Sequence, residues 1–295
     1  MSALSRLGRI ASATVLSAGF DSALDGYRRA LGARVVAEET LDPALAAHLD
    51  LADLAGQRVA WLSTGANPWL RVIDAPAVVG ESPTQLHGWL SLEVLVADVD
   101  ALAATLPRGW RVLRPPADLD VSPHIRACQV LGPSGELYYF TQVRAEVPPF
   151  ELPQTTLAVD RPFIVVLSTP DRERTRAAWE TLAGRTAWSF DTRITVLSHA
   201  LDLPLDTRYP VAVVQFRDQC LIEIDEVAQA RPRRPDVRYA GVHLVSIERG
   251  ALDPGLPGTG PAARFSSTGY DGRRTALWRG PSGERVELLE QPISR

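Results

Sequence analysis

A five-residue segment, GPSGE, occurs twice in this chain of 295 residues, at 132–136 and at 280–284. The first copy joins the apolar runs "RACQVL" and "LYYFTQ", and the second joins "TALW" and "RVELLE". Glycine and proline between β-rich runs indicate a hairpin turn. Because the copies lie about half the chain apart, we infer that a whole structural unit is repeated, and not only a turn.

The segments that begin the units repeat as well. "SATVLSAGFDSALDGYRRALG" predicts a strand, a turn and a helix with Leu24, Tyr27 and Leu31 on one face. "PFIVVLSTPDRERTRAAWETLAG" has the same plan, and "SLEVLVADVDALAATLP" is a third copy. In the fourth copy, "GVHLVSIERGALDPGLPG", Pro254 and Pro257 interrupt the helix, so we expect a short helix there or none.

These repeats predict an α+β fold of four βαβββ units. The units are paired into two similar halves, each a cupped mixed β-sheet with the helices outside. The expected N-terminal half covers 1–145, and the expected C-terminal half covers 146–295. The predicted units cover 8–75, 87–143, 161–227 and 238–292.

Composition excludes several functional classes. The net charge is -4, so the chain lacks the excess of basic residues expected of a nucleic-acid binder. Cys128 and Cys220 lie far apart, which argues against a disulfide framework or a cysteine zinc site. No apolar run near the N-terminus has the length of a signal peptide core or a membrane span. We therefore expect a cytoplasmic protein without a nucleic-acid or membrane partner.

The pattern resembles the vicinal oxygen chelate superfamily, which includes glyoxalase I, the extradiol ring-cleaving dioxygenases and the bleomycin-resistance proteins. "FDSALDGYRRALGARVV" is similar to the family's helix, and "GPSGERVELLE" is similar to its closing hairpin. The resemblance covers nearly the whole chain. It implies that paired units form a partly open β-barrel whose cup holds a small ligand or a metal.

In that family the metal ligands are a His early in the first strand of a unit and a Glu in the last strand. In the N-terminal half these two places fall on residues that are poor ligands. They are near Ser12 and Val72 in the first unit, and at Ser91 and Tyr139 in the second. The resemblance therefore implies that this half binds no metal.

The C-terminal half keeps part of the ligand set. In the third unit the two places are Ile164 and Glu223, and in the fourth they are His243 or its neighbour Val242, and Glu287. The resemblance implies Glu223, His243 and Glu287 as ligands of a divalent Fe, Mn, Ni or Zn ion, since these metals accept oxygen and imidazole. Ile164 in place of a His argues against extradiol dioxygenase activity.

Structural roles are the alternative for each of these residues. Side chains alternate along a strand, so if Val242 points into the cup, His243 points out of it. Glu223 and Glu287 are also consistent with a solvated strand face. Two further candidates are catalytic: His199 as a general acid or base over the cup, and Tyr270, which the resemblance to extradiol enzymes implies as a substrate-binding residue.

Three functions remain open at this point. The first is an enzyme of the lyase, isomerase or dioxygenase type that acts on a small oxygenated, in some cases aromatic, substrate. The second is a metal-free small-molecule-binding protein, similar to the drug-sequestering members, and the third is a structural or regulatory protein whose cup is filled by side chains. The partners expected are the small molecule and a second copy of the chain in a homodimer.

The pocket itself is expected in the C-terminal half. Its expected lining is Ile164, Glu223, Glu287 and Tyr270, with His199 near its mouth. An apolar pocket with a few convergent polar groups is the usual form of a small-molecule site. A buried carboxylate in such a pocket should have a raised pKa unless a metal or an arginine meets it, and this applies first to Glu287.

Overall fold

All four predicted units are present in the computed structural model, which describes residues 5–252 and 255–291. The first unit comprises β1 (Leu7–Ser17), α1 (Phe20–Leu31), β2 (Arg34–Thr40), α2 (Pro43–His48), the 3-10 helix η1 (Ala52–Leu54), β3 (Arg58–Ser63) and β4 (Leu70–Asp74). The second comprises η2 (Pro83–Gln85), β5 (Gly88–Val96), α3 (Val99–Thr105), β6 (Arg111–Leu119), β7 (Ser122–Leu131) and β8 (Leu137–Val143).

The third and fourth units follow the same plan. The third comprises β9 (Val159–Thr169), α4 (Arg172–Ala183), β10 (Trp188–Arg193), α5 (Thr195–Ala200), β11 (Arg208–Gln215) and β12 (Leu221–Glu226). The fourth comprises β13 (Gly241–Arg249), β14 (Ala263–Arg264), β15 (Arg274–Arg279) and β16 (Arg285–Glu290). Between β13 and β14 the described residues contain no helix, as expected, and Pro254 lies outside the described residues.

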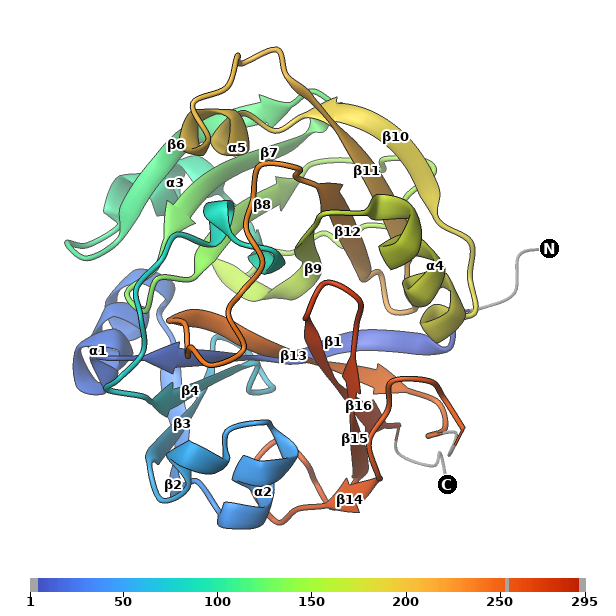
Figure 1. Cartoon of the computed structure of the whole chain (residues 1–295). Coiled ribbons are helices and arrows are strands. Elements are labelled where there is room, and N and C mark those ends of the chain that lie inside the picture. The colour runs from blue at the N-terminus through green and yellow to red at the C-terminus, as the bar shows by residue number, and fades with distance from the viewer. Residues whose placement is uncertain (1–4, 253–254, 292–295) are drawn as a thin grey trace.

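The units form two mixed eight-stranded sheets. One sheet has the order β14-β15-β16-β13-β1-β4-β3-β2 and combines the first and fourth units. The other has the order β10-β11-β12-β9-β5-β8-β7-β6 and combines the second and third units. We call them the outer-unit sheet and the inner-unit sheet. Figure 1 shows the inner-unit sheet above and the outer-unit sheet below, each curled around a concave side that we call its cup.

This pairing differs from a simple division into sequence halves. The first strand of the first unit pairs antiparallel with the first strand of the fourth, β1 with β13, and β5 pairs with β9 in the same way. Each cup therefore takes one unit from 1–145 and one from 146–295. The sequence repeat shows that the four units are alike, but it carries no information about which strand edges meet.

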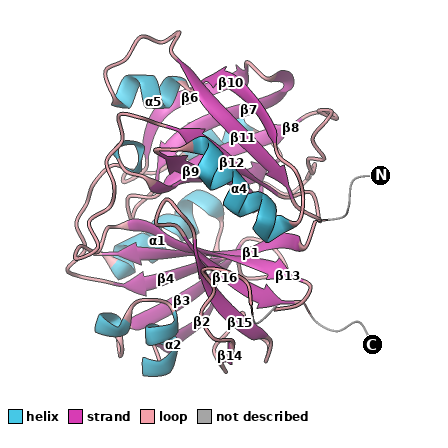
Figure 2. Cartoon of the chain, turned by 45° about the vertical axis from the view of Figure 1, so that its right-hand side comes forward, coloured by secondary structure: helices cyan, strands magenta, loops and turns pink. Residues whose placement is uncertain are grey.

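The α1 and α4 helices begin and end where the sequence predicts. The α4 helix begins at Asp171, whose carboxylate accepts a hydrogen bond from the Arg174 N–H at 3.0 Å. Both helices end at a glycine in the left-handed conformation, Gly32 after α1 and Gly184 after α4. Both helices pack where the two sheets meet (Figure 2).

The repeated turn has one structure in both places. In the first copy the Glu136 carboxylate folds back and accepts hydrogen bonds from the Ser134 N–H at 3.0 Å and from the Tyr27 hydroxyl at 2.6 Å. A side chain on Gly132 would overlap this carboxylate, so the position requires glycine. Tyr27 belongs to α1, so the turn of the second unit docks on the helix of the first.

The second copy docks in the same way. The Glu284 carboxylate accepts hydrogen bonds from the Ser282 N–H at 2.9 Å and from the indole N–H of Trp179 on α4 at 3.0 Å. Each turn thus ties a hairpin of one sheet to a helix of the unit before it, which belongs to the other sheet. The repeated GPSGE segment is therefore a joint between the sheets.

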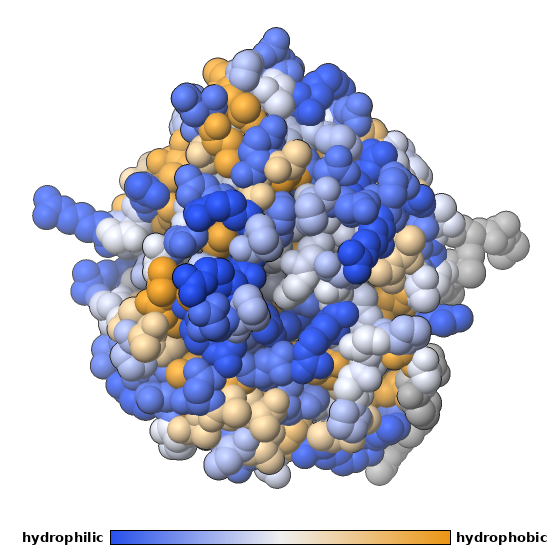
Figure 3. All heavy atoms as spheres, in the orientation of Figure 1, coloured by the Kyte–Doolittle hydropathy of each residue, from blue (hydrophilic) through white to orange (hydrophobic). Residues whose placement is uncertain are grey.

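On the side seen in Figure 3, hydrophilic residues cover most of the face and hydrophobic ones form separate patches. Among the described residues, no helix is long and apolar enough to cross a membrane.

Candidate ligand pocket

The outer-unit cup is filled by the chain itself. The α2 helix, which the sequence analysis did not predict, lies on the concave side of this sheet between its two curled ends (Figure 1). Leu45 of α2 and Leu49 after it are buried in one hydrophobic cluster with Trp61 of β3 and Leu277 of β15. This cup therefore has the packing of a core.

A buried guanidinium lies at the centre of the filled cup. Arg71, on β4, is fully buried. Its Nε donates to the Thr14 hydroxyl at 2.8 Å, its Nη1 to the Tyr270 hydroxyl at 2.6 Å and its Nη2 to Oε2 of Glu287 at 3.2 Å. A buried charge is tolerated only with such partners. Sequence analysis placed Val72 near this position, but β1 has register shifts that flank Thr14, and Arg71 is the residue that faces the cup.

Glu287 is equally well bound. The hydroxyls of Ser246 and Tyr270 each donate to its carboxylate at 2.7 Å, and Nε2 of His48 lies 3.6 Å from Oε1. Burial by itself would raise the pKa of Glu287, but the charge of Arg71 and the contact with His48 outweigh burial and lower that pKa to about 2. The sequence analysis expected a raised pKa for Glu287 unless an arginine or a metal meets it, and here Arg71 does.

The three predicted metal ligands do not come together. Glu223 is on β12 of the inner-unit sheet, whereas His243 and Glu287 are on β13 and β16 of the other. Nε2 of His243 lies 2.9 Å from the Leu49 carbonyl oxygen, to which it donates as the Nε2–H tautomer. Burial, with the nearby charge of Arg285, lowers the pKa of His243 to about 3, so the ring is neutral.

The predicted set therefore forms no metal site, because its members were assigned to one cup and the pairing of units divides them. Within residues 5–252 and 255–291, no group of three or more His, Cys, Asp and Glu side chains is arranged to hold a metal ion.

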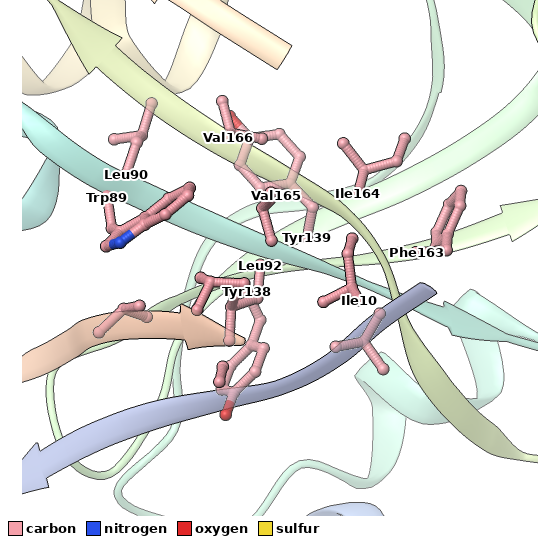
Figure 4. Close-up of a cluster of buried hydrophobic side chains, with 14 of the residues drawn as sticks. Ile10, Trp89, Leu90, Leu92, Tyr138, Tyr139, Phe163, Ile164, Val165 and Val166 are labelled. Carbon is pink, nitrogen blue, oxygen red and sulfur yellow. The ribbon is translucent and has the colours of Figure 1, made fainter. Parts of the chain in front are cut away.

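The inner-unit cup contains an open cavity of about 130 Å³. Its walls come from both units of the sheet and are mostly apolar or aromatic; they include Ile125, Phe150, Phe163, Ile164, Phe190 and Val213. Figure 4 shows Tyr139 and Ile164 on one side of the sheet, and Tyr138 and Val165 on the other. Alternation thus places Tyr139 and Ile164 in the cup, and Tyr138 and Val165 in the core between the sheets.

Two glutamates line this apolar cavity, together with Asp120. Glu93 comes from β5 and Glu223 from β12, and Tyr139, Thr141 and Gln129 lie with them in the lining. The Thr141 hydroxyl donates to Oε2 of Glu93 at 3.0 Å. Burial, with the nearby charge of Glu223, raises the pKa of Glu93 to about 8, so this acid is mostly protonated at neutral pH.

A third acid, Asp225, lies next to Glu223. It is 1 % exposed, and no hydroxyl or N–H group of the described residues donates to either of its carboxyl oxygens. Burial raises the pKa of Glu223 and of Asp225, and the adjacent Glu223 raises that of Asp225 further. The two carboxyl groups lie close together, and such proximity is favourable only when one of them carries a proton.

Comparison with known proteins supports the fold that this geometry suggests. No family model matches the sequence, and no curated protein matches it. Solved structures do match. Glyoxalase I from Zea mays has a TM-score of 0.59 at 15% identity, over 96% of this chain and 92% of that one. A protein from Bacillus subtilis subsp. subtilis str. 168, provisionally named a dioxygenase, has a TM-score of 0.63 at 13% identity, over 99% and 87%.

The chain has the vicinal oxygen chelate fold. The resemblance inferred from the repeated helix and hairpin is thereby confirmed for the architecture of both sheets, which run over nearly the full length of each matched structure. At these identities the likeness concerns the fold, and the chemistry of each cup has to be argued from its own residues.

The two cups of this vicinal oxygen chelate fold can be compared position by position through their strand registers. Ser12 pairs with Ser246 in one sheet as Ser91 pairs with Val166 in the other. The strand that corresponds to β1 is therefore β5, and the strand that corresponds to β13 is β9. Tyr139 pairs with Glu93 in the inner-unit sheet as Arg71 pairs with Thr14 in the outer-unit sheet, so Tyr139 and Arg71 occupy corresponding positions.

The last strands correspond in the same way. Glu223 pairs with Val166 and Glu287 with Ser246, so these two carboxylates occupy corresponding positions. The carboxylate of the last strand is therefore common to both cups, but Arg71 is replaced by Tyr139 in the inner-unit cup.

Of the other predicted site residues, the inner-unit cup contains Ile164, as expected, but neither Glu287 nor Tyr270, which belong to the outer-unit cup. His199 is on α5, and Nε2 of its ring lies 2.7 Å from Nη1 of Arg114 at the surface. It does not line the cavity, although Thr195 and Val196 of the same helix do.

Sequence reasoning missed three charged residues that matter here: Arg71, Glu93 and Asp225. Arg71 and Glu93 each interrupt an apolar strand run, in "WLRVID" and "SLEVLV", whereas Asp225 is one of several acids in "CLIEIDE". A lone charge in a strand that is otherwise buried is the signal that could have identified Arg71 and Glu93, since such a charge needs a partner.

Proposed function

We propose that the inner-unit cup binds a small organic molecule whose ring-sized apolar part fills the cavity and whose polar end meets Glu93 and Glu223. The observation that carries this proposal is the contrast between a filled cup and an open one in the same chain. Apolar pockets with a few convergent polar groups are the usual small-molecule sites. An apolar cavity of about 150 Å³ holds benzene, so the cavity of about 130 Å³ is of the size of one ring.

Acid–base catalysis on the bound molecule is a second candidate, and a specific observation favours it. Glu93, with its pKa raised to about 8, can donate a proton at neutral pH, and the carboxyl pair of Glu223 and Asp225 can accept one. Carboxyl groups with raised pKa values are a common means of proton transfer to and from substrate oxygen or carbon. This supports an isomerase or lyase reaction on an oxygenated substrate.

The dioxygenase form of the hypothesis has less support. It needs a ligand at the first-strand place of the third unit, where Ile164 presents an apolar side chain to the cavity. A divalent Fe, Mn, Ni or Zn ion held through Glu223 would be an alternative use of the same cup, and the experiment below separates it from direct binding of an organic molecule.

The test of the proposed function is to fill the cavity. The change Ile164→Trp places a large side chain in the cup, and Leu205→Trp adds the same side chain at a loop position that is 48% exposed. Phenol and indole are suitable probes, followed by the chemical shifts of cavity-lining residues in NMR spectra, with and without added Mn²⁺ or Zn²⁺.

We expect both probes to perturb cavity residues in the native protein and in Leu205→Trp, and to bind at least tenfold more weakly to Ile164→Trp. Metal-independent binding supports the proposal. Equal binding to all three proteins, or shifts confined to residues outside the cup, would show that the cavity is not the binding site.

A further inference from the structure

We propose that the molecule bound in the inner-unit cup carries an organic cation, an amidinium, a guanidinium or a protonated amine, which pairs with Glu93 and Glu223. This inference rests on the proposed function, because it names the chemical class of the ligand of the same cavity. It is drawn from a comparison within the molecule: the outer-unit cup already contains such a cation, and it is covalently part of the chain.

The outer-unit cup shows what the last-strand carboxylate binds. Glu287 is held by the guanidinium of Arg71, which reaches it at 3.2 Å from the strand beside β1. In the inner-unit cup the carboxylate at the corresponding position is Glu223, and the position of Arg71 is taken by Tyr139. Tyr139 carries no positive charge, so the ion pair of the filled cup has lost its cation in the open one while its carboxylate is kept.

Charge in the open cup is unbalanced. Glu93, Glu223 and Asp225 come from two strands and lie close together, since the charge of Glu223 raises the pKa of Glu93, and the charges of both glutamates raise that of Asp225. Of the described residues that line the cavity, the only cation is Arg193, whose Nε donates to Asp120 at the rim at 2.6 Å. A cluster of buried acids without a cation is costly, and it is relieved either by protons or by a positively charged ligand.

Asp225 provides an independent sign that a partner is missing. Its two carboxyl oxygens are buried and receive no hydrogen bond from any hydroxyl or N–H group of the described residues. Buried polar atoms without a partner are rare in folded proteins. Asp225 lies two residues after Glu223 on β12, and therefore on the face that lines the cup. A cation bound at Glu223 would favour the ionised forms of Glu223 and Asp225 and would offset their negative charge.

The size of the cavity restricts the ligand further. It has room for about one ring, and its walls are aliphatic and aromatic. A planar amidinium or guanidinium presents two parallel N–H groups to one carboxylate. A molecule with an amidinium, guanidinium or ammonium group on an aryl or benzyl ring would therefore place its ring against Ile164 and Phe163 and its charged end at Glu93 and Glu223.

Binding of a cation should release protons. Glu93 faces Glu223 and Asp225 from β12, Tyr139 from β8 and the hydroxyl of Thr141, with Tyr209 on β11 near Asp225 and the Asp120–Arg193 pair at the rim. No free basic side chain is among these groups. At pH 7 the acids hold protons, and a cationic ligand favours their charged forms, so affinity for the cation should rise with pH up to about 8.

The experiment uses three probes of the same shape and different charge. Benzamidine is cationic, benzamide neutral and benzoate anionic at pH 7. Binding to the full chain is measured by isothermal titration calorimetry in two buffers that differ in ionisation enthalpy, which gives the number of protons released. We expect benzamidine to bind at least tenfold more tightly than benzamide, with proton release, and benzoate to bind most weakly.

Three variants locate the charge. Glu223→Gln and Glu93→Gln keep the shape of the cup and should each reduce the preference for benzamidine over benzamide at least tenfold, and Glu173→Gln, on the exposed face of α4, is the control. Tyr139→Arg rebuilds the internal cation of the other cup and should abolish benzamidine binding. The control, Glu173→Gln, should bind benzamidine as the wild type does. If one Gln variant fails to fold, the other carries the same test.

The outcomes separate this inference from the proposed function. Equal affinity for benzamidine and benzamide, both lost in Ile164→Trp, would overturn the cation and leave the pocket intact. Benzamidine binding that survives both Gln variants would also overturn it. Tight binding of Mn²⁺ or Zn²⁺ alone that displaces benzamidine would show that the natural cation is a metal, which contradicts an organic one. Binding of every probe that persists in Ile164→Trp would instead reject the pocket.

Discussion

The two cups of this molecule are built from the same units and differ in what occupies them. In the outer-unit cup, α2 and its neighbours fill the concave side, and Arg71 neutralises Glu287. In the inner-unit cup the concave side is open, and Glu93, Glu223 and Asp225 have no basic partner among the described residues that line it. The comparison teaches that one cup has become part of the core, which leaves the other as the place where a ligand can bind.

The largest effect should come from breaking the filled cup. The change Arg71→Met removes the guanidinium and leaves Glu287 buried with the hydroxyls of Ser246 and Tyr270 and the ring of His48. Removal of one partner of a buried ion pair costs about 3–5 kcal/mol, and we expect a loss of that size in the free energy of unfolding by urea at pH 7. The double variant Arg71→Met with Glu287→Gln should recover part of it.

The pH dependence of the same pair gives a second check. The pKa of Glu287 is lowered in the folded state to about 2, so the stabilisation is present above the ordinary carboxyl pKa and is lost as the pH falls towards 2. The difference between wild type and Arg71→Met should therefore shrink in acid. A difference that is below about 1 kcal/mol at pH 7, or independent of pH, would mean that the guanidinium does not hold this cup together.

The open cup should have the opposite pH dependence. The pKa of Glu93 is raised on folding to about 8, and those of Glu223 and Asp225 are raised as well. The folded state therefore favours the neutral form of these acids. Their protonation stabilises the folded state at low pH, and this contribution is lost as the pH rises from about 4.3 to about 8. We expect a decrease on the order of 2 kcal/mol across this range.

Glu93→Gln should flatten this dependence, measured as urea midpoints from pH 5 to 9. Glu136 and Glu284 also have pKa values raised to about 7 by burial, so the comparison needs the wild type at every pH. A slope in Glu93→Gln that equals the wild-type slope would assign the effect to the two turns and not to the cup.

The smallest effect should come from the turns that join the sheets. Tyr27→Phe removes the hydroxyl that donates to Glu136, and Trp179→Phe removes the indole N–H that donates to Glu284. Loss of a hydrogen bond to a buried group costs about 1–3 kcal/mol, with a further loss in Trp179→Phe from the smaller ring.

Double-variant cycles with Glu136→Gln and Glu284→Gln isolate the two hydrogen bonds in thermal unfolding. Similar coupling energies at both turns would confirm that the repeated segment has one structural role. A coupling near zero at either turn would show that its sequence identity with the other has no structural meaning there.

Much of the fold could be predicted because its signals are local. The GPSGE segments, the helix ends at Gly32 and Gly184 and the alternation of apolar residues in the strands all depend on neighbours in the chain. The site was less accessible. Ile164 and Glu223 were correctly expected in one pocket, whereas Glu287 and Tyr270 were assigned to it through the assumption that the third and fourth units share a cup.

The sequence by itself determined the four units, the repeated hairpin turn, and the carboxylate at the end of the third and fourth units. Only the tertiary structure decided which units pair, and with that which carboxylates meet. The physical reason is that a strand edge offers the same backbone groups to any partner, so the choice between partners depends on contacts far apart in the chain. Side chains also alternate between the two faces of a strand. Only the strand pairing shows that Arg71, and not Val72, lies beside Thr14 in one cup, and that Tyr139 lies beside Glu93 in the other.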